Sequence, residues 1–311
     1  MLDGFTATEI RTAESSIFLR SAGSGPPLLL LHGFPETHVM WRGVAPLLTD
    51  RFTVLCADLR GYGRSGCPAS LPDHSPYAKR AMALELVEVM RQLGWPRFSV
   101  AGHDRGGRVA YRMALDHPDR IERLAVLDVL PTAEMWDRAD ARLACAFWPW
   151  SLLAQPEPLP ERLVLGAPEA IVENALAEWG SPSSVFDPEI RAAYAEPLKD
   201  AAHVHAICED YRAAATRDWE DDIADRSAGR RIKCPVLALW SKGSGLDSWY
   251  RDAGGPLALW RSWADQVDGN AVDAGHFLPE EAPELTAAAL AAFFDASSGG
   301  EGVLRPPSPR R

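Results

Sequence analysis

The chain has 311 residues, of which 47% are hydrophobic and 24% charged, and its formal net charge is −11 at pH 7. This composition is typical of a globular protein with one large domain or a domain that carries an insertion. The acidic balance and the lack of a basic block exclude nucleic acid as a partner. No apolar run approaches the about 18 residues that a membrane-spanning helix needs, so we expect no membrane partner.

The N-terminus is polar and of mixed charge, and it lacks the apolar segment of a signal peptide. The cysteine count is odd, and no two cysteines have CxxC spacing. This pattern favours reduced thiols over a disulfide framework, and it predicts a cytoplasmic protein.

Short apolar runs alternate with helical patterns along the chain. The predicted strands span residues 26–34, 52–59, 98–104, 124–129 and 234–240, and the predicted helices span 75–94, 107–118 and 280–294. Continuous apolar strands between helices are typical of a parallel sheet that is covered on both faces. The sequence therefore predicts the α/β class, with a mostly parallel sheet flanked by helices.

The strand rhythm stops between residues 131 and 232, where Trp, Ala, Pro and charged residues form short helical patterns. We interpret this stretch as a helical cap inserted into a core made of residues 1–130 and 233–296. The last residues, 297–311, are rich in Gly, Ser and Pro without periodicity, which predicts a disordered tail.

The segment AGHDRGGRVAY, residues 101–111, joins a predicted strand to a predicted helix. A Gly-x-nucleophile-x-Gly turn in this context presents its central side chain at the edge of a parallel sheet, and here that residue is Asp104. Gly102 and Gly106 relieve crowding in such a turn. The simpler alternative is that Asp104 only caps the following helix.

Two further segments complete a catalytic pattern. The sequence HGFP follows the first strong strand, and there Phe34 can offer a backbone N–H to an oxyanion, as can Arg105 directly after the nucleophile. His276 stands before the last helix, which fits the chain order nucleophile, acid, histidine. His103 is the competing histidine, and we give it a packing role beneath the turn.

The acid that orients the histidine has two candidates. Asp128 ends the strand LAVLDV, whereas Asp247 follows a later strand across the longer loop SKGSGL. A carboxylate at a strand end suits the orienting role, so we favour Asp128.

Arg105 and Arg108 lie one and four residues after Asp104. On a helix these positions share one face, and a guanidinium fork binds carboxylates in bidentate fashion. An adjacent arginine also keeps an aspartate ionised. The pair therefore predicts a small anionic substrate. The simpler interpretation is that Arg108 is a solvated helix residue and that Arg105 pairs with a surface acid.

Several motifs together resemble the haloacetate dehalogenases, in particular the fluoroacetate dehalogenase group of the α/β-hydrolase superfamily. The matching segments are HGFPETHVMW, GHDRGGR, VLDVLPT, WSLLAQPEPLPE, CEDYRAA and GHFLPEEAPELTAAAL. The resemblance implies an α/β-hydrolase fold with an inserted helical cap. It also implies hydrolytic dehalogenation of a 2-haloacid through an ester on Asp104, with no metal or organic cofactor, and it suggests a homodimer.

The same resemblance assigns roles to further residues. It places the substrate carboxylate at Arg105 and Arg108, supports Asp128 as the acid, and gives the leaving halide to Trp150 and Tyr211. A histidine of the family's halide site is replaced by Pro149, which has neither a side-chain donor nor a backbone N–H. We therefore expect fluoride release to be impaired. The remaining residues expected to line the pocket are Trp148, Pro149 and Trp179, and the Trp148 indole is a candidate replacement donor.

Two other functions fit parts of the pattern. An epoxide hydrolase would use the same aspartate and His–Asp pair, but it needs tyrosine hydroxyls from the cap. Tyr211 is the one candidate that we can assign, and we find no second. A binding protein on a hydrolase scaffold would have no need of the intact His276 and Asp128.

Overall fold

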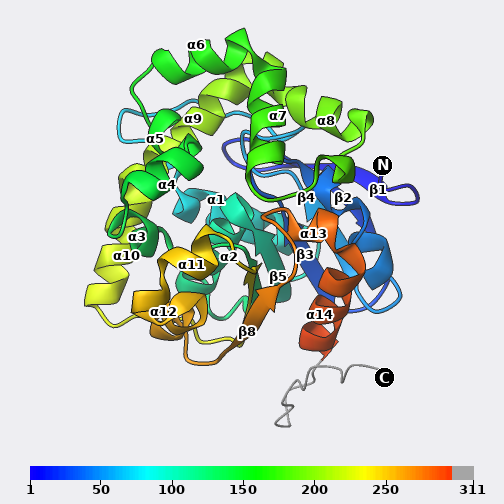
Figure 1. Ribbon diagram of the computed structural model, residues 1–311. Helices are drawn as coiled ribbons and strands as arrows, with labels where there is room; N and C mark the ends of the chain where they lie inside the picture. Colours follow the sequence, from blue (N-terminus) through cyan, green and yellow to red (C-terminus); the bar gives the residue numbers. More distant parts are fainter. Residues whose placement is uncertain (296–311) are drawn as a thin grey trace.

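The computed structural model describes residues 1–295 and contains one eight-stranded sheet with helices around it (Figure 1). The strands are β1 (Thr6–Arg11), β2 (Ser16–Ala22), β3 (Pro27–Leu31), β4 (Thr53–Ala57), β5 (Phe98–His103), β6 (Ile121–Leu127), β7 (Val236–Ser241) and β8 (Val267–Val272). Their order across the sheet is β1-β2-β4-β3-β5-β6-β7-β8. Strand β2 pairs antiparallel with β1 and β4, and all other neighbours are parallel. The predicted α/β class with a mostly parallel sheet is confirmed.

The central strands form the core of the molecule. In β3, Leu28 to Leu31 are fully buried, and every residue of β5 is buried as well. Helices on both faces remove these strands from water, which is why their sequences are continuously apolar rather than alternating. The carboxyl ends of β3, β5 and β6 are neighbours, so the loops that follow them meet at one edge of the sheet.

Helices occupy most of the rest of the described chain, and Figure 1 shows α6, α7, α8 and α9 together at the top of the view, away from α12 and α14. The helices are α1 (Lys79–Gln92), α2 (Asp104–Asp116), α3 (Thr132–Trp136), α4 (Ala141–Ala146), α5 (Pro149–Leu152), α6 (Leu159–Gly166), α7 (Pro168–Glu178), α8 (Pro188–Ala195), α9 (Ala201–Ala215), α10 (Arg217–Ser227), α11 (Gly245–Trp249), α12 (Gly255–Trp263), α13 (Leu278–Glu281) and α14 (Pro283–Asp295). Helices α3 to α10 fall in the interval between β6 and β7 that was expected to hold the cap. The division into core and cap domains stays a prediction.

The structure differs from the sequence prediction at identifiable points. Strands β1, β2 and β8 were not predicted. Strands β1 and β8 are partly exposed and carry polar residues rather than an apolar run, and in β2 the buried apolar run spans only three residues. The helix predicted over 280–294 is interrupted between α13 and α14, where Pro283 cannot donate a helical hydrogen bond. The predicted tail, 297–311, lies outside the described residues. Within residues 1–295 no helix is both long and apolar enough to cross a membrane.

Candidate active site

The turn between β5 and α2 carries Asp104 in a strained conformation. Its φ of +43° lies in the left-handed region, which residues with a Cβ rarely adopt. The backbone of the turn passes so close to β3 that a Cβ at Gly106 would lie 2.5 Å from the carbonyl oxygen of His32. Only glycine fits there, and the Gly106 N–H donates to that same oxygen at 2.9 Å. The sharp turn thus holds Asp104 at the sheet edge, where the loop after β3 also arrives.

Asp104 accepts a backbone hydrogen bond and lies near several positively charged side chains. Its Oδ1 accepts a hydrogen bond of 3.1 Å from the backbone N–H of Phe34. Burial favours the neutral carboxyl, but the charges of His276, Arg108 and Arg105 outweigh this effect and hold the pKa of Asp104 below its ordinary value. The carboxylate is therefore ionised at neutral pH, as a nucleophile must be.

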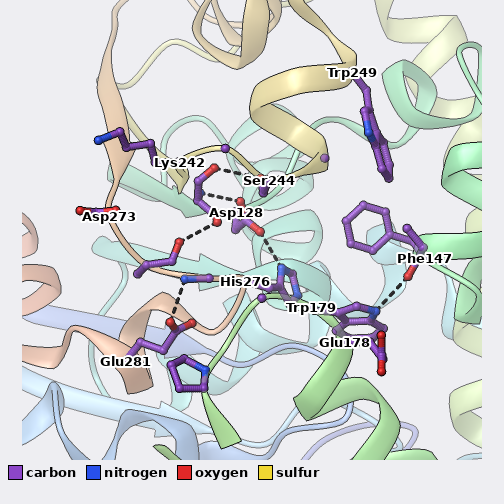
Figure 2. A pocket seen from close by; sticks show the side chains of 18 residues that line it. Asp128, Phe147, Glu178, Trp179, Lys242, Ser244, Trp249, Asp273, His276 and Glu281 are labelled. Carbon is purple, nitrogen blue, oxygen red and sulfur yellow. Dashed lines mark hydrogen bonds and ion pairs between the residues drawn. The ribbon is translucent and has the colours of Figure 1, made fainter.

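His276 and Asp128 form a hydrogen-bonded pair, as Figure 2 shows. Asp128 directly follows β6, and its Oδ2 lies 2.6 Å from Nδ1 of His276. Its other oxygen accepts the backbone N–H of Ser241 at 2.9 Å, so both carboxylate oxygens are fixed. The backbone N–H of His276 donates to the carbonyl oxygen of Trp179 at 3.0 Å. With Nδ1 held by Asp128, Nε2 is the ring nitrogen left for proton transfer.

The other candidate acid, Asp247, serves a different contact. It lies in α11 and accepts hydrogen bonds from the Trp240 indole at 2.8 Å and from the Gly243 backbone at 2.9 Å. The structure therefore brings Asp128, and not Asp247, to His276.

His103 lies beneath the turn and connects two loops of the site. Its Nδ1 is 2.9 Å from Glu36 Oε2, and its Nε2 is 2.8 Å from the carbonyl oxygen of His276. Because a carboxylate and a carbonyl can only accept, both ring nitrogens carry hydrogens. Glu36 also accepts the N–H of Gly33, so this buried ion pair links the loop after β3, the nucleophile turn and the histidine loop.

This ion pair predicts a pH dependence of stability. Burial alone would lower the pKa of His103, but Glu36 raises it to about 9 from its ordinary 6.5. The folded protein thus keeps a proton that the unfolded chain releases near pH 6.5. We expect this contribution to the free energy of unfolding to be complete below pH 6.5 and to be lost as the pH rises to about 9. Urea unfolding at both pH values should show a smaller loss for His103→Gln than for the parent, and an equal loss would contradict the assignment.

Arg105 is buried on α2, and its guanidinium is held by helix α9. Nε donates to Asp210 Oδ2 at 2.8 Å, and Nη2 donates to the backbone oxygen of Asp210 at 2.9 Å. The guanidinium carbon lies 4.1 Å over the ring of Tyr211. The third nitrogen, Nη1, is buried and has no hydrogen-bond partner.

Arg108 is also buried, but no carboxylate of the described residues forms an ion pair with it. Its Nη1 donates to the carbonyl oxygen of Leu130 at 2.8 Å and to the Thr132 hydroxyl at 3.3 Å. Its Nε is buried without a partner, and its guanidinium carbon lies 4.3 Å over the ring of Trp150. Burial and the charge of Arg105 lower the pKa of Arg108, and the nearby Asp104 carboxylate opposes the shift only in part. Arg108 therefore supplies the less compensated positive charge of the site.

The two aromatic residues expected at the leaving group, Trp150 and Tyr211, are both buried near the arginines. Tyr211 lies edge-on to Phe34, with ring centroids 5.7 Å apart, and Trp150 packs against Trp136. Within residues 1–295 neither the Trp150 indole nor the Tyr211 hydroxyl has a hydrogen-bond partner. Both groups can therefore donate to a ligand.

The remaining residues expected to line the pocket are Pro149, Trp148 and Trp179, and each has a different environment. Pro149 is buried at the first position of α5. The Trp148 indole, the candidate replacement for the missing histidine, donates to Asn174 Oδ1 on α7 at 2.8 Å, so its N–H is engaged there. Trp179 lies perpendicular to the His276 ring, with centroids 5.3 Å apart, and its indole donates to the carbonyl oxygen of Ala146.

A cavity of about 480 Å³ opens beside the His276–Asp128 pair (Figure 2). Phe147, Trp179 and Trp249 form an aromatic part of its wall, and Lys242 and Glu178 also line it. Asp104 is not among its lining residues. The cavity therefore borders the His276–Asp128 pair rather than Asp104.

Sequence reasoning missed the charged residues behind Arg105. Asp210 stands next to Tyr211 in the chain and neutralises Arg105, whose partner was expected to be a surface acid if it had one. Lys79 and Tyr62 in turn contact Asp210 from α1 and from the loop after β4. One signal in the sequence could have indicated such a residue: two arginines beside a single aspartate need a further carboxylate if both are buried.

Comparison with known proteins places the chain. The sequence profile of the alpha/beta hydrolase fold matches residues 26–283. A fluoroacetate dehalogenase from Burkholderia sp. is 42% identical over 301 residues, which cover 96% of this chain and 97% of the relative. A soluble epoxide hydrolase from Corynebacterium sp. (strain C12) is 32% identical over 287 residues, or 88% of this chain and 92% of the relative.

Solved structures agree with the sequence matches. A protein from Nostoc sp. PCC 7120, assigned to the alpha/beta hydrolases, superposes with a TM-score of 0.91 at 48% identity. The superposition covers 95% of this chain and 100% of that protein. The chain therefore belongs to the α/β-hydrolase fold family.

Proposed function

We propose that the protein hydrolyses the carbon–halogen bond of small 2-haloacids, haloacetates above all, and releases the 2-hydroxy acid and halide. The observation that carries this proposal is the pair of unpartnered, buried donors, Arg105 Nη1 and Arg108 Nε, around an ionised Asp104. A buried guanidinium N–H without an acceptor is costly, and a substrate carboxylate would supply the missing acceptors. The similarity to a Burkholderia protein named as a fluoroacetate dehalogenase supports the same substrate class.

In the first half-reaction, Asp104 Oδ2 attacks the α-carbon of the bound haloacid in line with the leaving group. A carbon–oxygen bond forms, and the carbon–halogen bond breaks with its electron pair on the halide. Oδ1, which already accepts the Phe34 N–H, becomes the carbonyl oxygen of the resulting ester. A carboxylate suits this alkyl transfer because water can cleave the ester, whereas a serine nucleophile would form a stable ether.

In the second half-reaction, His276 Nε2 takes a proton from water, and the hydroxide attacks the carbonyl carbon of the Asp104 ester. The N–H of Phe34 and that of Arg105 stabilise the oxyanion, since the Arg105 amide belongs to the first turn of α2 and has no partner within the helix. The ester bond then breaks, and the product hydroxyl recovers the proton from His276. Asp104 is left as a carboxylic acid, which releases its proton to solvent and returns to the carboxylate. Asp128 orients the ring and stabilises its charged form.

The tyrosines argue against the alternative of epoxide hydrolysis, which needs cap hydroxyls to protonate the opening ring. Of the six tyrosines in the chain, all within the described residues, only Tyr211 has a hydroxyl without a hydrogen-bond partner. The other five hydroxyls all have partners: Tyr62 with Asp210, Tyr77 with Pro68, Tyr111 with Thr132 and Asp222, Tyr194 with Glu280, and Tyr250 with Met135. The buried arginines also suit an anion better than a neutral epoxide.

The test is to incubate the protein with fluoro-, chloro- and bromoacetate and with styrene oxide, and to follow halide and diol. We expect halide from chloro- and bromoacetate and no diol. The absence of halide from every haloacetate would contradict the proposal.

The leaving-group site predicts a halide preference. Fluoride needs strong hydrogen bonding to leave, and Pro149 removes one donor beside Trp150 and Tyr211. We expect Pro149→His to raise the rate of fluoride release relative to chloride release by about tenfold, the effect of one added hydrogen bond to a charged group. Pro149→Ala, which removes the ring but adds no side-chain donor, is the matched control. An unchanged ratio in both variants would remove this position from the halide site.

A further inference from the structure

Arg105 belongs to the sheet-flanking helix α2, yet residues of α9 fix the orientation of its side chain. Asp210 accepts from two of the three guanidinium nitrogens, once through its carboxylate and once through its backbone oxygen. The ring of Tyr211 lies against the face of the same guanidinium. These contacts leave Nη1 as the nitrogen without a partner.

Asp210 is itself held on both carboxylate oxygens. Oδ2 also accepts from the Tyr62 hydroxyl at 2.9 Å, and Oδ1 pairs with Nζ of Lys79. Lys79 in turn pairs with Asp218 on α10, at 3.1 Å. The side chains of Asp210, Tyr62, Lys79 and Asp218 are all buried, so the charges of the lysine and the two aspartates require their partners. Burial would raise the pKa of Asp210, but Arg105 and Lys79 hold it far below the ordinary value, and the carboxylate stays charged.

We propose that Asp210 is a positioning residue for the substrate: it fixes the Arg105 fork so that Nη1 faces the bound carboxylate. Arg105 then binds as an oriented donor whose charge is already balanced, whereas Arg108 supplies the attraction for the anion. Because the holding groups come from α9, the carboxylate site is complete only while α9 packs against α1 and α2. This proposal rests on the proposed function.

The test is Asp210→Asn, which keeps the size of the side chain and removes its charge. We expect the KM for chloroacetate to rise by about tenfold to a hundredfold, the range for losing a hydrogen bond to a charged group, with a smaller change in kcat. Calorimetric binding of acetate, which has a carboxylate but no leaving group, should weaken by a similar factor. Tyr62→Phe removes one contact to Asp210 and should give a smaller rise in KM.

The matched control is Asp218→Asn, which perturbs the same lysine without touching Arg105. We expect it to lower the thermal midpoint while the KM for chloroacetate stays within about twofold of the parent, as expected for a group that makes no contact with Arg105. If Asp210→Asn and Tyr62→Phe lower kcat and the thermal midpoint but leave the KM and acetate binding unchanged, Asp210 is only structural. If the parent neither releases halide nor binds acetate, the proposed function fails instead, so the two failures are distinguishable.

Discussion

His276→Asn is expected to stop the reaction after the first half. The variant should release about one equivalent of halide per protein and then turn over about a hundredfold to ten-thousandfold more slowly, the usual contribution of a general base. The reason is geometric: His276 is fixed by Asp128 to accept a proton from water, while the displacement of halide by Asp104 involves no proton transfer to the histidine. Mass spectrometry should find a peptide containing Asp104 that is heavier by one carboxymethyl group.

Substitutions of Asp128 and Asp247, the two candidates for the acid that orients His276, provide the control. Asp128→Asn should slow turnover because it removes the charge at His276 Nδ1, whereas Asp247→Asn should leave turnover unchanged, since within residues 1–295 the hydrogen bonds of the Asp247 carboxylate go to Trp240 and Gly243 and not to His276. Added mass on another peptide, or none despite turnover by the parent, would show that the ester on Asp104 does not form.

Arg108→Met is expected to lower kcat/KM for chloroacetate by at least about thirtyfold, because removing one partner of a buried charge pair costs about 2 to 5 kcal/mol. Methionine keeps an apolar stem for packing against Trp150 but removes the unpaired Nε and the charge. A loss that appears mainly in KM would place Arg108 at the substrate carboxylate in the ground state as well as in the transition state.

The same substitution makes a prediction for pH. Arg108 is one of the charges that hold the pKa of Asp104 down against burial, so its removal should raise that pKa. The acid limb of the kcat/KM profile should therefore move to higher pH, as the carboxylate is lost earlier on acidification. Steady-state rates measured across the acid range test this shift, and unchanged kinetics together with an unmoved limb would exclude Arg108 from the site.

The sequence was sufficient for the fold class and for the residues that stand at strand ends. Asp104, Asp128 and His276 follow β5, β6 and β8, and parallel strands bring such positions to one edge whatever their distance in the chain. Strand β8 itself was missed because its polar, half-exposed residues have no strand signature. The place of His276 was found from the helix after it.

The contacts that orient the arginines could not be predicted in the same way. Lys79 on α1 is more than a hundred residues from Asp210 on α9 and Asp218 on α10, and each by itself resembles an ordinary surface residue. Their meeting depends on how α9 and α10 pack on α1, which no local pattern records. The same holds for Trp148, whose indole N–H is engaged by Asn174 of α7.

A single turnover in ¹⁸O-labelled water tests the central claim, the ester on Asp104, most directly. With protein in excess over chloroacetate, the hydroxyl oxygen of the first glycolate should be unlabelled, because it comes from Asp104, and the label should appear in the Asp104 carboxylate. Glycolate labelled in its hydroxyl group during the first turnover would mean that water attacks the substrate carbon itself, and it would contradict the account.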